Sequence, residues 1–253
     1  MKEVLLSAKG LCKQFSNGTA KEQILKNIDV DIYAGEFTVI MGSSGAGKST
    51  LLYALSGMDS ITEGAVLYKG KEISSYKERQ MAALRSHEFG FVFQQTHLVS
   101  SLSLFENVAV AGFVNSGESA ETVRKKAEGL LKQMHVEKAK DRFPSEVSGG
   151  EAQRAAIARA VINQPGLLFA DEPTGALNKG NTDEVLDLLS GLSDNGQSIL
   201  MVTHDIRAAI RGTRILYLED GKILDEMELP VYREEDAKDR EKTLNDWLSA
   251  LSW

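Results

Sequence analysis

One segment, residues 42–50, constrains the fold of this chain more than any other. It reads Gly-Ser-Ser-Gly-Ala-Gly-Lys-Ser-Thr and lies between an apolar stretch and a leucine-containing one. Gly42, Gly47, Lys48 and Ser49 fit the spacing G-x-x-x-x-G-K-[ST], in which glycines let the backbone curl so that successive N–H groups point at phosphates. A strand pattern before the segment and a helix pattern after it therefore predict a P-loop in a nucleotide-binding α/β fold.

The expected chemistry of this loop follows from its position at a helix start. The helix should begin near Lys48, so its first N–H groups and its dipole favour an anion. Lys48 is expected to reach the outer phosphates, and Ser49 is the expected magnesium ligand. A Gly/Ser-rich surface turn before an unrelated helix is the alternative, and the flanking patterns disfavour it. The predicted nucleotide contacts are Gly42, Ser43, Ser44, Gly45, Ala46, Gly47, Lys48, Ser49 and Thr50.

Composition and charge predict a soluble cytoplasmic protein. The 253 residues can bury an ample core, and no apolar run approaches the roughly 20 residues that span a bilayer. The start of the chain breaks its apolar run with charge too soon for a signal peptide. Because Cys12 is the single cysteine, we expect no internal disulfide and only a packing role for it. The net charge of -7 disfavours a general nucleic-acid surface and adhesion to anionic lipid.

The order of strand and helix patterns predicts a mainly parallel α/β sheet with two additions. Alternating or apolar stretches predict strands at residues 4–15, 24–33, 37–41, 89–93, 167–170 and 198–203. Another short strand is expected after a turn at Gly64. The helical period dominates residues 103–161, most strongly in the amphipathic stretch 121–135. We therefore expect one domain at residues 1–230, with an N-terminal antiparallel β subdomain and a helical subdomain at about residues 95–165.

A second nucleotide element follows the apolar strand at residues 167–170. Asp171 and Glu172 come directly after it, and at the carboxyl edge of a parallel sheet they are expected to face the P-loop. Asp171 can then hold magnesium through water while Glu172 polarises the attacking water. An acidic turn after a buried strand is the alternative, and the presence of the P-loop weighs against it.

The segment between these two elements carries a resemblance to a known family. Residues 147–154 read Val-Ser-Gly-Gly-Glu-Ala-Gln-Arg and lead into a helical run. Ser148, Gly149 and Gly150 match the signature of ATP-binding-cassette (ABC) transporters, whose ATP-binding subunit the chain resembles over roughly residues 3–228. A Ser-Gly-Gly turn at a helix N-terminus offers N–H groups and a hydroxyl that can grip a γ-phosphate presented by another subunit. An ordinary helix N-cap is the alternative meaning.

This resemblance implies a fold, an enzyme activity and partners. The implied fold is a P-loop NTPase core with a mainly parallel sheet, an N-terminal antiparallel β subdomain and a helical signature subdomain. The implied activity is ATP hydrolysis with Mg²⁺ in a head-to-tail dimer, where the signature of one copy covers the P-loop of the other. The implied partner is an integral membrane permease that holds the cassettes at the inner face of the cell membrane, and nucleic acid is not expected.

Three further residues fall where the family has functional ones. Gln94 ends its strand at the position of a glutamine that senses magnesium and the γ-phosphate. His204, in Val-Thr-His-Asp, matches the switch histidine that contacts the γ-phosphate and helps to position water. Phe15 lies where an aromatic residue, more often tyrosine, stacks on adenine, with core packing as the alternative. The resemblance thus gives the catalytic residues Glu172, His204 and Gln94 and the metal ligands Ser49, Gln94 and Asp171.

One departure from the family concerns Asn178. The family usually carries aspartate there, which helps to link the two active sites, whereas asparagine keeps a carbonyl acceptor but loses the charge. We expect ATP hydrolysis to survive because Asp171 and Glu172 are present, while the coupling between sites differs. The exchanges at Val147, Glu151 and Ala152 are conservative for the phosphate contact.

Several phrases are most similar to one branch of the family. They are residues 90–94, 170–177 and 203–205, and they resemble the branch of lipoprotein-releasing, macrolide-exporting and bacitracin-type peptide-resistance proteins. In that branch the permease has a large extracellular domain that moves when the ATPases close. Asn178 leans towards the members that give resistance to antimicrobial peptides.

The end of the chain adds a segment beyond the family core. After Pro230 comes a charged run, and then an apolar helical face made by Leu244, Trp247, Leu248 and Leu251. We expect this extension, residues 231–253, to pack on its own domain, with docking on a permease or second subunit as the alternative.

A soluble ABC ATPase acting on DNA, on ribosomes or in cell division is the alternative function. Such relatives usually carry a tandem cassette, a long coiled-coil insertion or a basic linker, and this acidic single cassette has none of them. A P-loop kinase or GTPase is disfavoured because it needs neither the Ser-Gly-Gly signature nor the pair Gln94 and His204. Specificity in the family lies in the permease, so the cassette does not carry the identity or direction of what is transported.

Overall fold

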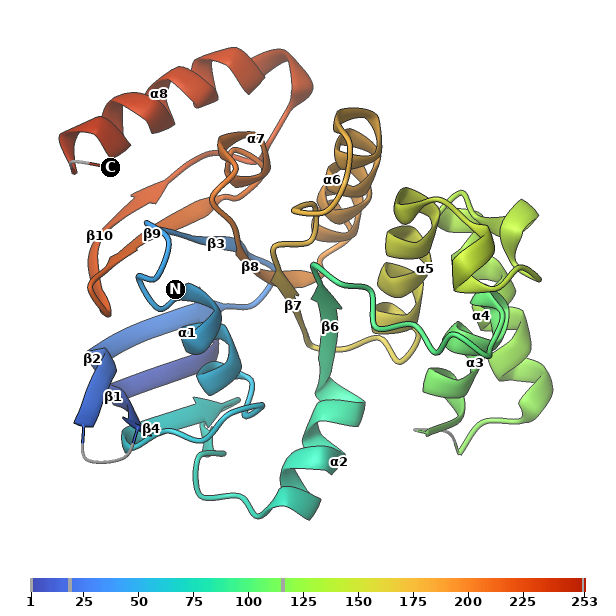
Figure 1. The fold of residues 1–253 in the computed structure, drawn as a ribbon, viewed down its shortest axis with the longest axis horizontal. Helices are drawn as coiled ribbons and strands as arrows, with labels where there is room; N and C mark the ends of the chain where they lie inside the picture. The colour runs from blue at the N-terminus through green and yellow to red at the C-terminus, as the bar shows by residue number, and fades with distance from the viewer. Residues whose placement is uncertain (1, 18–19, 115–116, 252) are drawn as a thin grey trace. The chain divides into compact units, whose positions relative to one another are not determined.

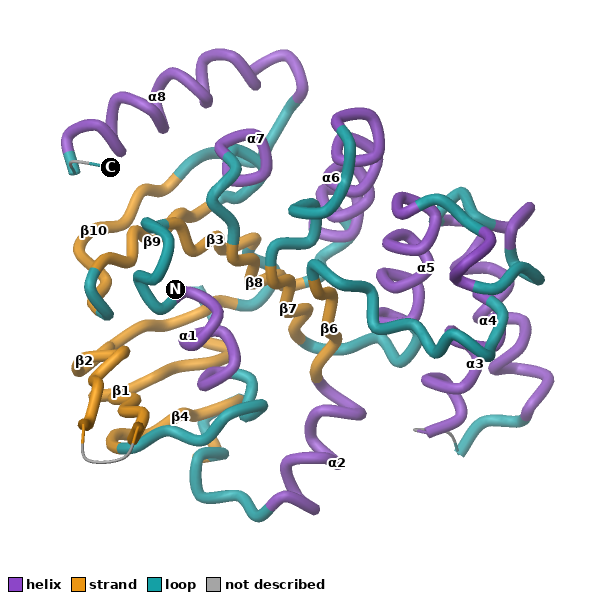
Figure 2. Tube along the Cα trace, in the orientation of Figure 1, coloured by secondary structure: helices purple, strands orange, loops and turns teal. Residues whose placement is uncertain are grey.

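The computed structural model describes residues 2–17, 20–114, 117–251 and 253, and in it the chain divides into two units. Unit 1 comprises Met1–Met81 and Ser193–Trp253, and unit 2 comprises Ala82–Leu192. Figure 1 labels their elements, and Figure 2 shows that strands predominate in unit 1 while helices predominate in unit 2. The helical subdomain expected at about residues 95–165 lies within the sequence range of unit 2.

The N-terminal part of unit 1 forms an antiparallel sheet, as predicted. Its strands lie in the order β2-β1-β4-β5, with the bounds β1 (Val4–Asn17), β2 (Ala20–Tyr33), β4 (Glu63–Tyr68) and β5 (Lys71–Glu72). The prediction of a turn at Gly64 was wrong, because this residue lies inside β4. Its φ of 91° and the carbonyl oxygen of Gly10, which a Cβ would approach to 2.4 Å, show that a close strand approach requires the glycine.

Further strands of unit 1 include the two predicted at residues 37–41 and 198–203, together with β9 (Arg214–Glu219) and β10 (Lys222–Glu228), which were not predicted. They lie in the order β10-β9-β3-β8, with the bounds β3 (Phe37–Met41) and β8 (Ser198–Val202) for the two predicted strands. Strand β3 runs parallel to both β8 and β9, and β10 is antiparallel to β9. Every residue of β3 and β8 is buried, which explains why both read as continuous apolar stretches.

The helices of unit 1 connect and cover these strands. They include α1 (Lys48–Leu55), α7 (Ile206–Ala209) and α8 (Ala237–Ala250), together with the 3₁₀ turn η3 (Glu234–Asp236). Helix α1 begins at Lys48, as predicted. Helix α2 (Glu78–Glu88) begins in unit 1 and ends in unit 2.

Unit 2 combines two parallel strands with the predicted helices. Its elements are β6 (Phe89–Phe93), β7 (Leu167–Asp171), α3 (Leu104–Val114), α4 (Ala120–Gln133), η1 (Glu137–Ala139), η2 (Pro144–Glu146), α5 (Gly149–Val161) and α6 (Lys179–Asp194). Phe91 and Phe169 stack between the strands, with ring centroids 5.4 Å apart. The apolar side of α4 is buried through Val123, Ala127 and Leu131, which confirms the amphipathic pattern of this stretch.

The C-terminal extension packs within unit 1. Leu244 and Leu248 of α8 are buried, and the indole N–H of Trp247 donates to Asp225 at 2.9 Å. In Figure 1 the helix lies beside α7 and the pair β9 and β10. The apolar face at the end of the chain therefore meets its own unit. Across the described part of the chain, no helix combines the length and the apolar character needed to cross a membrane.

Candidate functional site

The P-loop has the curled form that its glycines predict. Gly47 adopts a left-handed φ of 102° at the start of α1. The Lys48 ammonium group donates to the carbonyl oxygens of Gly42 at 2.9 Å and Ser43 at 2.8 Å, so it lies within the curl. A Cβ on Gly42 would lie 1.9 Å from the carbonyl oxygen of Leu218, which leaves room for glycine alone. The loop thus places a cation beside the N–H groups of a helix start, as phosphate binding requires.

The carboxylate of Glu219, which the sequence did not predict as a site residue, holds this loop in place by hydrogen bonds. Glu219 accepts hydrogen bonds from the Ser43 hydroxyl at 2.7 Å, from the Ser43 N–H at 3.3 Å and from the Tyr217 hydroxyl at 3.1 Å. The Ser43 hydroxyl bond is the main cause that lowers the pKa of Glu219, and burial opposes it. Next to it, Gly221 donates its N–H to the carbonyl oxygen of Ala46 at 3.1 Å. The end of β9 and the turn after it therefore contact the phosphate loop at two points, Ser43 and Ala46.

His204 leaves the sheet at the same edge as the P-loop. Strands β3 and β8 are parallel neighbours with Ile40 opposite Val202, so the segments that follow them emerge side by side. The N–H of Thr203 donates to the carbonyl oxygen of Ile40 at 3.2 Å, and His204 is exposed just beyond it. Asp205 then caps α7 by accepting the Arg207 N–H at 2.9 Å.

Phe15 of β1 has an exposed ring rather than a core position. Its exposed fraction is 45 %, which removes the alternative of core packing. The Lys13 ammonium group lies over the ring, 4.8 Å from its centroid. The ring is therefore available for stacking on a flat ligand.

Unit 2 brings Gln94 and Glu172 together. Strands β6 and β7 are parallel with Phe93 opposite Asp171, so Gln94 and Glu172 are the next residues of adjacent strands. The Gln94 amide lies over Gly175, where a Cβ would come within 2.8 Å of its nitrogen. Glu172 has a left-handed φ of 47°, an uncommon conformation for a residue with a side chain, and such strain clusters at functional sites. Asp171 is buried at the end of β7.

The Ser-Gly-Gly signature forms the start of α5 in the same unit. Ser148 caps the helix: its hydroxyl oxygen accepts the Glu151 N–H at 3.2 Å. Glu151 accepts the N–H and the hydroxyl of Ser148, both at 2.8 Å, and these bonds, the backbone one first, lower its pKa. A Cβ on Gly150 would lie 2.4 Å from the Asn181 side chain. Ser148 thus serves as an N-cap, which was the alternative interpretation of the signature. The capped helix also presents the N-terminal N–H groups that an anion site needs.

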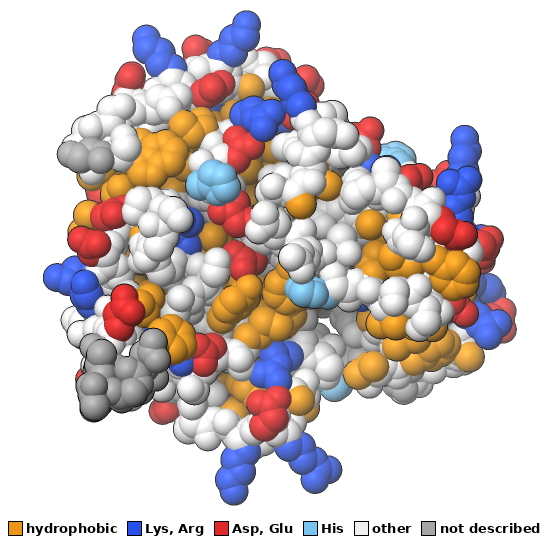
Figure 3. Space-filling model, viewed as in Figure 1, with side chains coloured by type: hydrophobic (Ala, Val, Ile, Leu, Met, Phe, Trp, Pro, Cys, Tyr) orange, Lys and Arg blue, Asp and Glu red, His pale blue; other side chains and the backbone are white. Residues whose placement is uncertain are grey.

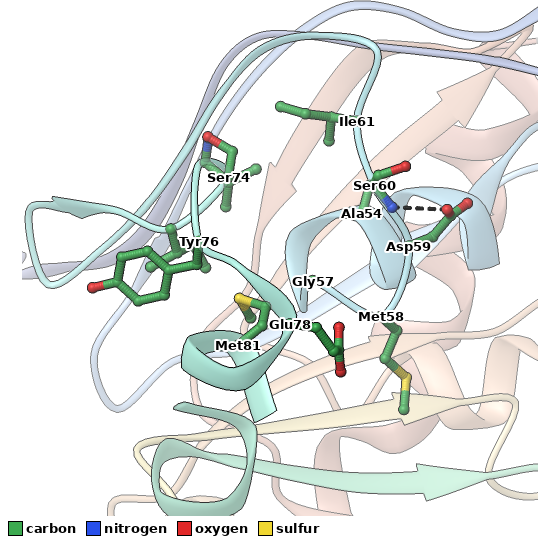
Figure 4. Close-up of a pocket in the computed structure, with 12 residues that line it drawn as sticks. Ala54, Gly57, Met58, Asp59, Ser60, Ile61, Ser74, Tyr76, Glu78 and Met81 are labelled. Atoms are coloured by element: carbon green, nitrogen blue, oxygen red, sulfur yellow. Dashed lines mark hydrogen bonds between the residues drawn. The ribbon is translucent and has the colours of Figure 1, made fainter. Parts of the chain in front are cut away.

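A pocket elsewhere in unit 1 is separate from this chemistry. Figure 4 shows it at the C-terminal end of α1, whereas the P-loop lies at the N-terminal end of that helix. Its volume is about 170 Å³, and its lining combines polar and apolar side chains from Ala54, Gly57, Met58, Asp59, Ser60, Ile61, Val66, Ile73, Ser74, Tyr76, Glu78 and Met81. It contains none of the predicted nucleotide contacts.

Comparison with known proteins shows the family to which the chain belongs. The profile of the family described as ABC transporter matches residues 25–175. The macrolide export ATP-binding/permease protein MacB of Wolinella succinogenes is 40% identical over 234 residues, which are 92% of this chain and 36% of that protein. MacB of Pasteurella multocida is 37% identical over 224 residues, 88% of this chain and 34% of the relative. The chain thus spans about a third of the length of these curated relatives, and the predicted resemblance to the branch with macrolide exporters is confirmed.

Solved structures give the same result for the fold. The dimeric, post-hydrolysis ATP-binding cassette MJ0796 bound to ADP and Pi has a TM-score of 0.84 at 36% identity, covering 90% of this chain and all of that one. CbiO1 of Clostridium perfringens, titled as part of the ABC transporter complex cbiONQ, has a TM-score of 0.80 at 30% identity, with 90% and 89% coverage. The P-loop NTPase fold is therefore confirmed, and the chain belongs to the ABC transporter family.

Proposed function

We propose that two copies of this chain bind ATP and Mg²⁺ head to tail and use hydrolysis to drive a membrane permease. The observation that carries the proposal is the placement of the catalytic candidates at strand ends. The P-loop and His204 follow adjacent strands of unit 1, and Gln94 and Glu172 follow adjacent strands of unit 2. Carboxyl ends of parallel strands are where open α/β sheets bind their ligands.

The residues expected to hold Mg²⁺ have the right donor chemistry. Ser49 offers a hydroxyl in the first turn of α1, Asp171 a carboxylate at the end of β7, and Gln94 an amide oxygen. Mg²⁺ prefers oxygen ligands and keeps several waters, so a hydroxyl, an amide and a water-mediated carboxylate suit it. When bound, the ion neutralises the charge that develops on the phosphates. Lys48 supplies further positive charge beside the same phosphates.

Glu172 and His204 are the proposed water-handling groups. Glu172 would orient and polarise the attacking water, and its left-handed backbone fixes the direction in which the carboxylate leaves the strand. His204 would contact the γ-phosphate and help to place the same water. Phe15, exposed on β1, would stack on the adenine ring.

The signature gives the reason for a dimer. Ser148, Gly149 and Gly150 form a capped helix start whose N–H groups suit a γ-phosphate presented by a second copy. A solved relative at 36% identity is titled as the dimeric structure of an ABC transporter cassette. In such a dimer ATP lies between the copies, so its binding closes the interface and its hydrolysis reopens it.

A permease is the proposed partner because of what the relatives contain. The MacB relatives are named ATP-binding/permease proteins, and this chain matches only about a third of their length. In Figure 3, hydrophobic side chains gather over the helices of unit 2, and exposed apolar patches often mark protein interfaces. The exposed side chains of this unit include Val99, Val110, Phe113, Val114 and Phe143. We place the cassette at the cytoplasmic face of the membrane, on a permease that exports macrolides or gives resistance to antimicrobial peptides.

The test of the dimer is the mass of purified Glu172→Gln protein by light scattering, with and without Mg-ATP. Removing the carboxylate should stop hydrolysis and retain binding, so ATP is expected to convert monomer to dimer. Adding Lys48→Ala to the same protein is the control, because loss of the P-loop cation should abolish productive ATP binding and keep it monomeric. A Glu172→Gln protein that binds ATP and stays monomeric contradicts the dimer, and a fully active one contradicts the role of Glu172.

Co-purification tests the partner. The chain is expressed with an affinity tag in its native cells, and the expected result is a co-purifying membrane permease that stimulates the ATPase activity of the chain. Recovery with ribosomes or nucleic acid, and not with a permease, would instead favour the soluble class of ABC ATPases.

A further inference from the structure

A buried arginine of the C-terminal helix holds the end of α7. The Arg240 guanidinium donates to the carbonyl oxygens of Ile210 at 2.8 Å, Gly212 at 2.6 Å and Pro230 at 2.6 Å. Its exposed fraction is only 4 %, and Tyr232 lies over it with the ring centroid 5.6 Å away. One side chain of α8 therefore binds three backbone acceptors, and two of them, in Ile210 and Gly212, belong to buried residues that need a hydrogen-bond partner.

Two of those acceptors, the carbonyl oxygens of Ile210 and Gly212, lie just after α7, the short helix that follows His204. Helix α7 has only four residues, Ile206–Ala209, and Ile210 is its C-cap. A helix this short has almost no intrinsic stability, so contacts at its two ends must fix it. Asp205 caps the first end, directly after His204, and the Arg240 cation favours the carbonyl end through the helix dipole.

The surrounding packing leaves α7 little freedom to shift while these contacts hold. Ala208, Ala209 and Ile210 are buried, and Gly212 lies so close to β3 that a Cβ would come within 2.6 Å of Val39. Arg240 thus fixes the C-terminal end of α7 through hydrogen bonds, and the N-terminal end of α7 follows His204 in the chain, with only Asp205 between them. Loss of the Arg240 hydrogen bonds would therefore shift α7, and this shift would move the backbone of His204, which lies one helical turn away.

We propose that Arg240 is a positioning residue for His204, which makes the C-terminal helix α8 part of the catalytic apparatus. The proposal rests on the role of His204 in the proposed function. Arg240 does not contact the reacting groups. It fixes the position of α7, and the position of α7 determines where the backbone of His204 holds its imidazole ring. The extension beyond Pro230 then acts on turnover as well as on folding.

The first test reads His204 without any need for activity. The chain has four histidines, and the other three, His87, His97 and His135, all belong to unit 2. Ring-proton NMR of Arg240→Gln should show a shifted His204 signal, assigned with His204→Ala, and unchanged signals for the other three. Arg240→Lys keeps the charge but loses the planar fork, so it should give a smaller shift and serves if Arg240→Gln does not fold. An unmoved His204 signal in a folded variant overturns the proposal.

The second test separates positioning from stability. Arg240→Gln is expected to lower kcat for ATP about tenfold and to leave KM within about twofold, because a small displacement of a catalytic group costs rate and not binding. Trp247→Phe is the matched control: it loosens α8 at its Asp225 contact and leaves Arg240 in place. In a His204→Ala background Arg240→Gln should cause no further loss. Equal losses in both backgrounds, or an equal loss in Trp247→Phe, overturn the proposal.

These outcomes differ from failure of the proposed function. If the wild-type chain with its permease hydrolyses no ATP, the proposed function fails, and the NMR comparison still decides whether Arg240 places His204. If the wild type turns over and His204→Ala does not, an unchanged kcat in Arg240→Gln removes the positioning role alone.

Discussion

The hydroxyl of Ser43 donates a 2.7 Å hydrogen bond to a carboxylate oxygen of Glu219, and this contact ties the P-loop to the turn after β9. The two residues are 176 positions apart in the chain. Asp220 and Gly221, which connect β9 to β10, both have positive φ, as a tight hairpin turn requires. The phosphate loop is therefore held by its own glycines from within and by a carboxylate from a distant strand.

Replacing this carboxylate should cost stability in a pH-dependent way. Because hydrogen bonds from Ser43 lower the pKa of folded Glu219 below its ordinary value of 4.5, the charged form stabilises the fold above that pH. The contribution is lost as the pH falls through 4.5 towards the lower folded pKa. We expect Glu219→Gln to lower the free energy of unfolding by about 1 kcal/mol at neutral pH and by progressively less below about pH 4.5.

Thermal unfolding of both proteins between pH 3 and pH 8 measures this difference. Asp220→Asn is the matched control, since it makes the same carboxylate-to-amide change at the next position and asparagine tolerates a positive φ. A Glu219→Gln deficit that stays constant down to pH 3 would show that the charge of Glu219 is not what stabilises the loop.

Loss of the Ser148 hydroxyl should have two separable effects. Ser148→Ala removes the N-cap of α5 and is expected to cost about 1 kcal/mol of stability. It should also abolish the ATP-dependent dimer of the Glu172→Gln protein, because the hydroxyl is a proposed γ-phosphate contact. Ser119→Ala, which removes the N-cap of α4 in the same unit, should cost similar stability and leave the dimer intact. If both variants dimerise equally, Ser148 acts only as a helix N-cap and does not contact the γ-phosphate.

The unusual Asn178 can be changed without losing its structural role. Its side-chain oxygen accepts the Asn181 N–H at 3.1 Å and caps α6, and aspartate caps equally well with a favourable charge at the helix start. Asn178→Asp should therefore keep or slightly raise stability while changing the cooperativity of ATP hydrolysis more than ATP affinity. Asn178→Ser, which keeps a cap without charge, should leave cooperativity as it is. A Hill coefficient that is the same in all three proteins would remove the idea that residue 178 couples the sites.

Local patterns in the sequence predicted most of the elements and the nucleotide-binding motif. Strands β3 and β6 have the predicted bounds, because runs of buried residues leave a continuous apolar signal. The P-loop is likewise a local feature, since adjacent glycines and a lysine make it. The family resemblance then placed Gln94 and Glu172 in roles that their positions on neighbouring strand ends fit.

The parts that were not predicted depend on contacts between distant residues. Nothing in the spacing around Glu219 or Arg240 indicates their partners, because each bonds a segment that only the tertiary fold brings near. Gly64 was misread as a turn since a glycine that permits close strand approach looks the same in sequence as one that permits a turn.

The C-terminal helix should behave as an integral part of unit 1. Leu248 is 1 % exposed, so Leu248→Ala leaves a cavity and is expected to cost about 2–4 kcal/mol of stability. Leu224→Ala is the matched control, because Leu224 is 55 % exposed and the same truncation there should change stability by less than about 0.5 kcal/mol. Thermal unfolding compares the two.

Truncation after Pro230 extends the same reasoning to the whole helix. It removes the buried side chains Leu244 and Leu248 and leaves the carbonyl oxygens that Arg240 satisfies without their donor, so unit 1 should unfold at a distinctly lower temperature. If the helix instead serves only to dock on another protein, truncation should leave the melting temperature unchanged and reduce the yield of the permease complex. Unchanged stability, ATPase activity and complex formation together would contradict both roles, because burial of two leucines and an arginine cannot be removed without consequence if the packing stabilises the fold.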